Sequence, residues 1–113
     1  MDRLNDYRQI IRRIIGEYLE YIPTEKDVDT IGIIDEKGEN FILLEVGWRY
    51  PKHVHRAFFH IRIKDDKIWI EEDWTHEGIA TELIKAGVPP DMIVLGWQPP
   101  EMRPYVDLAG IVS

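Results

Sequence analysis

The stretch "HIRIKDDKIWIEED", residues 60–73, decides the fold because it has the pattern of two strands joined by a two-residue turn. Apolar and polar residues alternate on both sides of Asp65 and Asp66, and this period of two is typical of half-buried strands. A two-residue turn fixes the antiparallel register of the strands that flank it. The predicted pairs are Ile63 with Ile68, Arg62 with Trp69, Ile61 with Ile70 and His60 with Glu71. One face of this hairpin is then apolar, and the other combines arginine with an aromatic ring and histidine with a carboxylate.

The same alternation extends toward the N-terminus. "TIGIID", residues 30–35, and "FILLEVGW", residues 41–48, flank the Gly-containing turn "EKGEN" and predict a second hairpin. "VHRAFFHIRI", residues 54–63, predicts the strand that leads into the hairpin of residues 60–73. We therefore expect a four-stranded antiparallel meander between residues 30 and 73, with core packing for Trp48 and Trp69.

Helical patterns flank this meander. Residues 2–21 repeat apolar side chains at steps of three and four, which predicts an amphipathic helix that ends before Pro23. Thr75 is a suitable N-cap for a second helix, in which His76 and Glu77 would form the first turn, and Gly87 suits the position just past its end. Residues 92–97, "MIVLGW", predict a short buried strand or extended segment.

The fold class is therefore α+β. It comprises an N-terminal helix, a four-stranded antiparallel meander sheet, a second helix packed on one face of that sheet and a short extended C-terminal segment. A chain of 113 residues is long enough for one core and too short for two ordinary domains, so we expect a single domain over residues 1–113.

Composition excludes several kinds of chemistry. The chain has no cysteine, which removes thiolate catalysis and thiolate metal sites, and its one serine is the terminal Ser113. The formal net charge of -7 argues against strong direct DNA binding, because such binding depends on basic side chains that neutralise phosphates. No segment is apolar enough to cross a membrane, so we expect a cytoplasmic protein. From the residue types and motifs we expect no cofactor and no catalytic residue.

Acidic and histidine side chains leave one enzymatic alternative open. Glu71 and Asp73 would share a face of a regular strand, and a metal-dependent nuclease or hydrolase needs such paired carboxylates. His53 and His55 also share a side, with Asp73 or His76 as a possible third ligand. The sequence has no metal-binding motif of recognised spacing, so ordinary surface side chains are the simpler interpretation.

A candidate interaction surface combines exposed aromatic and basic residues. Trp74 and Trp97 stand at predicted element ends, where a partly exposed ring fits a protein interface. Arg8 and Arg12 lie one turn apart on the first helix, next to Arg13, and offer a basic stripe to an acidic partner or to DNA. Exposed tryptophans and an open sheet edge also make a homodimer a reasonable expectation.

Taken together, short segments along the chain resemble the XisI family. They are Tyr7-Arg8 with Ile10-Ile11, "VGW" at 46–48, "VH" at 54–55, "HIRIKDDKIWI" at 60–70, "GIATEL" at 78–83, "AGVP" at 86–89, "DMIVLG" at 91–96, Pro99-Pro100 and Arg103. Their order and spacing cover nearly the whole chain. The chain departs from the family at Trp74, where glycine is usual, at Trp97, where phenylalanine is usual, and in its end "YVDLAGIVS", which is unlike the usual Thr-containing tail.

The resemblance implies a role rather than a reaction. Proteins of this family are described as controlling factors for excision of the fdxN element, a DNA segment of heterocyst-forming cyanobacteria. It implies a XisH-like protein as partner, beside a site-specific recombinase that performs the strand chemistry. No catalytic residue is implied. Arg103 joins Arg8, Arg12, Trp74 and Trp97 as the candidate interaction surface.

Overall fold

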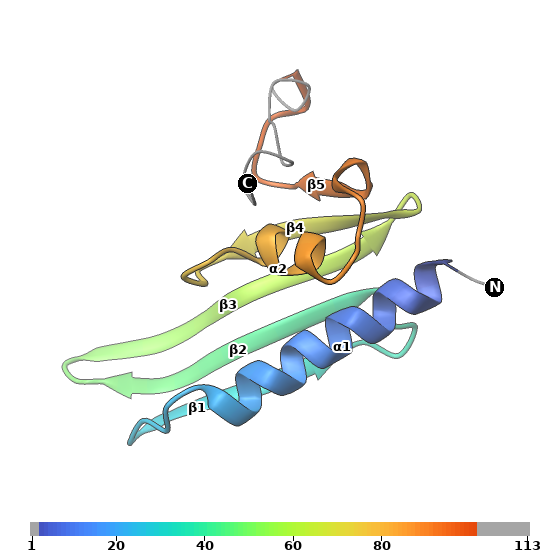
Figure 1. Cartoon of the computed structure of the whole chain (residues 1–113). Coiled ribbons are helices and arrows are strands. Elements are labelled where there is room, and N and C mark those ends of the chain that lie inside the picture. The colour runs from blue at the N-terminus through green and yellow to red at the C-terminus, as the bar shows by residue number, and fades with distance from the viewer. Residues whose placement is uncertain (1–2, 102–113) are drawn as a thin grey trace.

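The computed structural model describes residues 3–101. Within this range the chain forms two α-helices, a 3₁₀ turn and five strands (Figure 1). They are α1 (Arg3–Tyr21), β1 (Val28–Ile34), β2 (Asn40–Arg49), β3 (Lys52–Lys64), β4 (Lys67–Asp73), α2 (Ile79–Lys85), η1 (Pro90–Met92) and β5 (Ile93–Leu95). The predicted α+β class is confirmed, with the two helices on either side of the meander in sequence.

The sheet of the described residues has one strand more than the four predicted. β1 to β4 are antiparallel neighbours in chain order, as expected for a meander, and β5 adds to β4 in parallel. α2 provides the crossover that a parallel pair requires. Residues Ile93–Leu95 fall within the segment predicted as extended. Three residues are too few for an alternating pattern to identify them as part of the sheet.

The turn at Asp65 and Asp66 sets the register of β3 and β4 as predicted. Both aspartates have positive φ, at 53° and 60°, which matches the two-residue turn favoured in hairpins. The pairs Ile63–Ile68, Arg62–Trp69 and Ile61–Ile70 are confirmed. The fourth prediction is wrong, because His60 pairs with Glu72 and not with Glu71. An irregularity at this point leaves one extra residue on β4, which changes the alternation beyond it.

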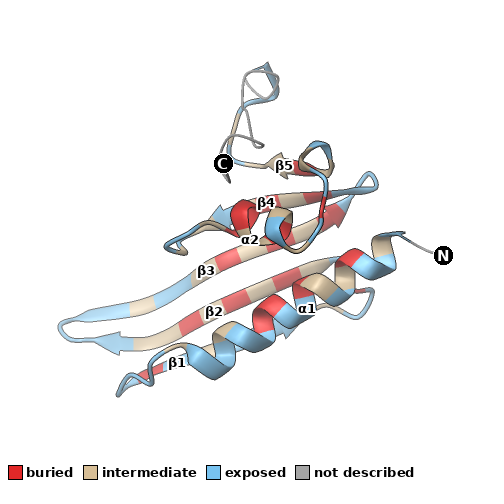
Figure 2. Cartoon of the chain, viewed as in Figure 1, coloured by how far each residue is buried: buried red, intermediate tan, exposed pale blue. Residues whose placement is uncertain are grey.

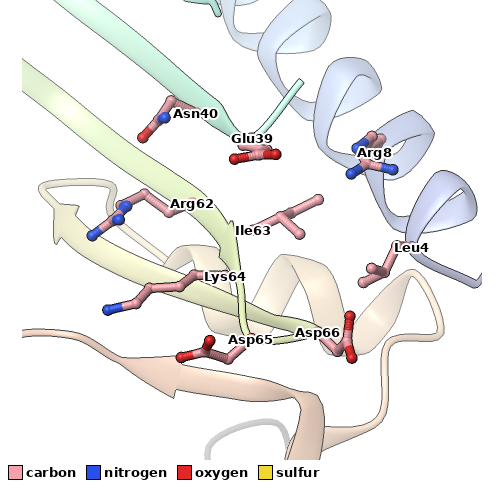
Figure 3. Close-up of a pocket in the computed structure, with 9 residues that line it drawn as sticks. All are labelled: Leu4, Arg8, Glu39, Asn40, Arg62, Ile63, Lys64, Asp65 and Asp66. Carbon is pink, nitrogen blue, oxygen red and sulfur yellow. The ribbon is translucent and has the colours of Figure 1, made fainter. Parts of the chain in front are cut away.

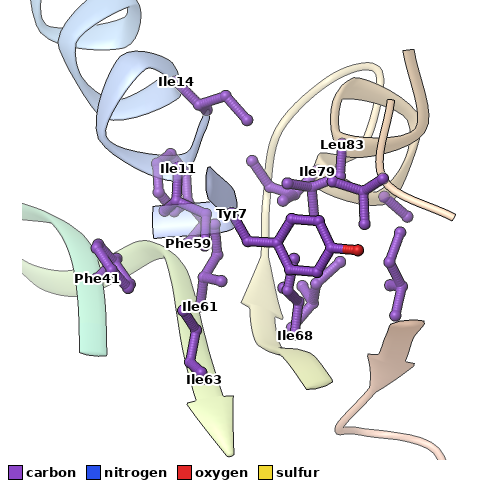
Figure 4. Packing of buried hydrophobic residues seen from close by; sticks show 14 of the residues in the cluster. Tyr7, Ile11, Ile14, Phe41, Phe59, Ile61, Ile63, Ile68, Ile79 and Leu83 are labelled. Atoms are coloured by element: carbon purple, nitrogen blue, oxygen red, sulfur yellow. The ribbon is translucent and has the colours of Figure 1, made fainter. Parts of the chain in front are cut away.

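One face of the sheet packs against both helices and forms the core (Figure 4). The buried α1 residues recur at the predicted helical spacing and meet the sheet's large apolar side chains. The fully buried ones are Ile11, Phe41, Leu43, Phe59, Ile61, Ile68, Ile70, Ile79, Leu83 and Val88. A Cβ at Gly32 would lie 3.0 Å from Leu19 and 3.1 Å from Ile15, so glycine lets α1 lie close to β1.

A partly buried polar contact joins the two helices. The Tyr18 hydroxyl on α1 donates to Oε2 of Glu82 on α2 at 2.7 Å. Burial raises the pKa of Tyr18, and the neighbouring Glu82 carboxylate adds to this shift. Burial also raises the pKa of Glu82, although the bond from Tyr18 opposes that effect. The two helices therefore have a fixed relative position at the end of the core.

The opposite face of the sheet carries no helix within residues 3–101 (Figure 1). Trp48 lies on this side and is 44% exposed, so the expectation of core packing is wrong for this ring. The buried Phe41 and Leu43 lie on the opposite side of β2 from Trp48. Across the same residues, neither helix is both long enough and apolar enough to cross a membrane.

Candidate protein interaction surface

Two of the five predicted surface residues lie together. Trp74 follows β4, Trp97 follows β5, and both line one shallow cleft of about 320 Å³ together with Glu71, Glu72 and Asp73. The parallel pairing of β4 with β5 brings them together, because the carboxyl ends of both strands meet at the same edge. Trp74 is 58% exposed and Trp97 is 50% exposed. We call these five residues the Trp74–Trp97 surface.

The remaining predicted residues lie elsewhere. Arg8 lines a different cleft, of about 300 Å³, with the turn residues Asp65 and Asp66 at the opposite end of β4 (Figure 3). Its Nε donates to the Gly38 carbonyl at 3.0 Å, so it fastens α1 to the β1–β2 turn. Arg12 is exposed on the same helix, and Arg103 lies outside the described residues. The predicted surface therefore divides into two separate regions.

The cleft beside Arg8 does not gather its cations around one ligand. Figure 3 shows Arg62 and Lys64 directed away from Arg8. The Arg62 guanidinium pairs with Glu71 at 3.1 Å, and the Lys64 ammonium lies 5.1 Å from the Trp69 ring centroid. Arg8, Arg62 and Lys64 therefore do not converge on one point where a phosphate would bind.

Three contacts hold Trp74 in position, one through its backbone and two through its ring. Its backbone N–H donates to the Phe58 carbonyl at 2.9 Å, which continues the β3–β4 pairing past Asp73. Its indole Nε1 donates to Glu72 at 2.7 Å. The Arg56 guanidinium lies 5.3 Å from its ring centroid, within the range of a cation–π contact. The exposed ring is thus fixed in position, which lowers the entropy that a partner would need to remove.

Arg56 is in turn held by Glu45, a buried carboxylate that sequence reasoning did not single out. Glu45 accepts from Arg56 Nε at 2.8 Å and from Arg49 Nη2 at 2.7 Å, and Arg49 also pairs with Glu25 at 2.6 Å. Burial alone would raise the pKa of Glu45, but the two arginine hydrogen bonds outweigh it and lower that pKa. The signal in the sequence is a single acid inside the apolar strand "FILLEVGW".

Asp73 organises the start of α2, in a way that differs from the predicted cap. α2 begins at Ile79, so Thr75 is not its N-cap, and His76 and Glu77 precede it. Asp73 accepts from the Ile79 backbone N–H at 2.7 Å and from the Thr75 N–H at 2.9 Å. Thr75 accepts from the Gly78 N–H at 3.1 Å, where Gly78 has a φ of 97°. Gly78, with its positive φ, lies just before the helix begins. Asp73 therefore takes the role predicted for Thr75, because it accepts from the N–H of Ile79, the first residue of α2.

Glu71 positions the turn that carries Trp97. The Gly96 N–H donates to the Ile70 carbonyl at 2.7 Å, and a Cβ on Gly96 would overlap the Glu71 carboxylate. Glycine at this position therefore allows Glu71 to lie against the turn while it pairs with Arg62. The Trp97 ring follows directly and is half exposed.

The carboxylates do not form the paired site that a metal-dependent nuclease needs. Because β4 has an extra residue, Glu72 lies opposite His60 on β3, and Asp73 lies opposite the buried Phe59. Glu71 and Asp73 therefore do not share a face, contrary to the prediction. Asp73 is directed to α2, and Glu71 to Arg62. Among residues 3–101, no group of three His, Asp or Glu side chains is arranged to hold a metal ion.

His53 and His55 share a side of β3, as predicted. Their rings lie 6.5 Å apart with 19° between their planes, and His53 also contacts the Trp48 ring at 5.0 Å. Neither Asp73 nor His76 lines the hollow beside these histidines, whose lining residues are Arg49, Lys52, His53, Val54, His55 and Arg56. The two histidines thus belong to an aromatic row on the hairpin.

Comparison with known proteins gives a consistent result. The sequence matches the family model described as XisI protein over residues 1–110. A crystal structure of a XisI-like protein from Anabaena variabilis is similar with a TM-score of 0.86 and 32% identity, over 93% of this chain and 96% of that chain. The fdxN element excision controlling factor XisI from Anabaena variabilis gives a TM-score of 0.79 and 36% identity, with the same coverage. No curated protein matches.

Proposed function

The chain belongs to the XisI family, and from this premise we propose that it controls the excision of a DNA element by binding a second protein. The partner in this proposal is a XisH-like protein, and a site-specific recombinase in the same complex performs the strand chemistry. The chain itself supplies a binding surface and no reacting group.

The observation that carries this proposal is the Trp74–Trp97 surface. Tryptophan is enriched among the residues that dominate protein interfaces, and two half-exposed rings line one cleft here. Three carboxylates border the rings, so the complementary partner surface carries lysine or arginine beside an apolar group. Arg56, Glu72 and the Gly96 turn hold the surface in place before binding.

The same surface disfavours direct contact with DNA. Carboxylates around the rings repel phosphates, and the whole chain has a net charge of -7. Arg8 lies at the other end of β4, and Arg12 lies near Gly38 of the β1–β2 turn. DNA contact in this proposal therefore comes from the other proteins of the complex.

Co-purification tests the proposal. We expect the tagged chain to retain the XisH-like protein encoded in the same genome at low and moderate salt, and to leave duplex DNA unshifted in gels at low salt. Addition of the partner should then produce a shifted species that contains both proteins. Failure to form any complex with the partner under mild salt would contradict the proposal, as would tight DNA binding by the chain alone.

A further inference from the structure

The strand β3 extends well beyond the part of it that pairs with β4. β3 covers Lys52–Lys64, but its pairing with β4 reaches only as far as Phe59. One more hydrogen bond on this side joins the Trp74 N–H to the Phe58 carbonyl. In the described part of the chain, residues 52–57 therefore pair with β2 alone. Figure 1 shows β3 continuing past the end of β4, and Figure 2 shows most of that part exposed. We call residues 52–57 the open edge of β3.

The register determines which backbone groups point outward from the open edge. The Trp48 N–H on β2 donates to the Asp27 carbonyl, so the Trp48 backbone faces β1 and not β3. His53 lies opposite Trp48, and successive pairs of an antiparallel ladder alternate between bonded and non-bonded. His53 and His55 therefore direct their backbone N–H and C=O groups away from β2. These donors and acceptors have the spacing that one further strand requires.

A hollow of about 370 Å³ lies along the open edge. Its lining residues are Arg49, Lys52, His53, Val54, His55 and Arg56. Five of them are consecutive in β3, and consecutive strand residues point to opposite faces of a sheet. The hollow therefore follows the edge of the strand and not one of its faces. A segment that fills the hollow meets the outward backbone groups of β3.

The polar side chains around this hollow are hydrogen-bond donors, and no described acidic residue lines it. The carboxylates of Glu25 and Glu45 offset the charges of Arg49 and Arg56 from outside the lining. Lys52 is exposed and adds a positive charge beyond these ion pairs. Arg56 bonds to Glu45 through Nε, and within residues 3–101 its terminal nitrogens have no acceptor. Carboxylates of an incoming segment therefore complement the hollow.

The open edge is continuous with the Trp74–Trp97 surface. Arg56 lines the hollow and lies 5.3 Å from the centroid of the Trp74 ring. The Trp74 N–H occupies the Phe58 carbonyl, and the outward groups of His55 follow along the same side of β3. A bound segment thus extends the β3–β4 pairing from the point that Trp74 reaches. One partner can contact the tryptophan rings and the open edge together.

A second copy of the chain does not complement this edge. In a two-fold antiparallel pairing centred on Val54, Lys52 of one copy lies opposite Arg56 of the other. Like charges at opposite positions of neighbouring strands destabilise a sheet. The charge of the edge therefore favours a different molecule, one with carboxylates.

We propose that an extended, acidic segment of the XisH-like partner adds as a strand to the open edge of β3. This inference rests on the proposed function, whose partner it takes, and adds the way in which that partner binds. Backbone hydrogen bonds to His53 and His55 hold the segment, and its carboxylates lie toward Lys52 and Arg56. The edge of six residues spans about 20 Å, so a partner segment of similar length pairs with it.

Amide hydrogen exchange, measured by NMR with and without the XisH-like partner, tests the pairing directly. The outward N–H groups of His53 and His55 should exchange at least about 10-fold more slowly in the complex, because each then donates to a partner carbonyl. Gly32 is the control at the opposite edge of the sheet. By the same alternation from the bonded Asp35, its N–H also points outward, and its exchange should not change.

Proline at position 55 tests the same hydrogen bonds by mutation. His55→Pro removes an outward N–H and leaves the bonds to β2 in place, which is possible for proline on an edge strand. His55→Ala removes the same ring and keeps the N–H. Partner affinity in calorimetric titration should fall at least about 10-fold for His55→Pro and less than about 3-fold for His55→Ala. Circular dichroism of both variants establishes that each is folded.

Charge reversal tests the acidic character of the segment. Lys52→Glu should weaken partner binding about 10-fold at low salt and less at high salt, because the lost attraction is between exposed charges. Lys67→Glu makes the same change in net charge at the far end of the β3–β4 hairpin, where Lys67 is also exposed. It should bind within about 2-fold of the unmodified chain.

Tight partner binding without protection of His53 and His55 would overturn the inference and leave the proposed function in place. Equal partner affinities of the folded His55→Pro and His55→Ala variants would also overturn it. Protection of these amides in the chain alone, increasing with its concentration, would assign the edge to a second copy and contradict the inference. Absence of any binding by the unmodified chain would contradict the proposed function, and this inference with it.

Discussion

At the scale of single residues, hydrogen-bonded carboxylates hold the turns and corners of this fold. Asp35 is the clearest case at the β1–β2 turn. Its Oδ1 accepts from the Glu39 N–H at 2.7 Å and from the Asn40 N–H at 3.0 Å, and its Oδ2 accepts from Asn40 Nδ2 at 2.9 Å. These bonds, with the Asn40 side chain first, lower the pKa of Asp35 to about 2.

Asp35→Asn should therefore change how stability depends on pH. A carboxyl whose pKa is lower in the folded state stabilises the fold above its unfolded pKa, and this contribution disappears as pH falls through the folded pKa. We expect the variant to melt at a lower temperature than the unmodified chain from pH 5 to 8, and the difference to shrink between about pH 4 and pH 2. Thermal melts at several pH values measure this.

Glu36→Gln, in the same turn, is the control for that series, because no hydrogen bond of the Asp35 kind holds Glu36, which is exposed. Its melting temperature should follow that of the unmodified chain at all pH values. An Asp35→Asn difference that persists unchanged at pH 2 would show that ionisation of Asp35 is not the source of the stability.

Glu45 connects the residue scale to the element scale. This one buried carboxylate links β2 to β3 through Arg56, and Arg56 supports the Trp74 ring beyond β4. The alternation of β2 places Glu45 on one side of the strand, but the arginines that meet it there depend on how the strands are arranged.

Glu45→Gln should destabilise the fold and loosen Trp74 together. Loss of the charged acceptor for Arg49 and Arg56 costs roughly 1 to 3 kcal/mol, because both hydrogen bonds join charged groups beside a buried site. Chemical denaturation gives this free energy, and collisional quenching of tryptophan fluorescence should increase. Glu20→Gln, an exposed site on α1, should change stability by less than about 0.5 kcal/mol. Equal stability of the Glu45 and Glu20 variants would contradict this account of the network.

At the scale of elements, the sequence predicts those features that depend on neighbouring residues, such as the register of a tight hairpin. The register of the β3–β4 hairpin follows from two aspartates with positive φ, and three of its four predicted pairs are correct. The fourth fails because the extra residue on β4 lies where Glu71 meets Gly96 from a later part of the chain. The start of α2 differs for a local reason, because Asp73, six residues before Ile79, accepts from its N–H. Neither the contact of Glu71 with Gly96 nor this side-chain cap follows from the period of the apolar residues.

The same limit applies to the candidate surface. Trp74 and Trp97 are recognisable as rings at element ends, but their shared cleft depends on the parallel strand β5, which is too short to predict as part of the sheet. Arg8 and Arg12 lie one turn apart on α1, as the spacing predicts, yet the fold places Arg8 at the far end of β4 and Arg12 near the β1–β2 turn. Spacing therefore predicts which face of an element a residue occupies, and topology decides which faces adjoin.

At the scale of the whole molecule, the two faces of the sheet differ, because the two helices pack on only one of them. The helices cover one face of the sheet and complete the core, and no helix of residues 3–101 covers the other face. The Trp74–Trp97 surface lies at the carboxyl end of β4, where Arg56 contacts the Trp74 ring.

The most direct test of the central claim is the affinity of the chain for its XisH-like partner, measured by calorimetric titration. We predict that replacing both Trp74 and Trp97 with alanine weakens binding at least about 30-fold, the effect of losing one dominant interface residue, while the fold persists. Tyr21→Ala should bind as the unmodified chain does. Full affinity in the folded double variant would contradict the claim that this acidic aromatic surface receives the partner.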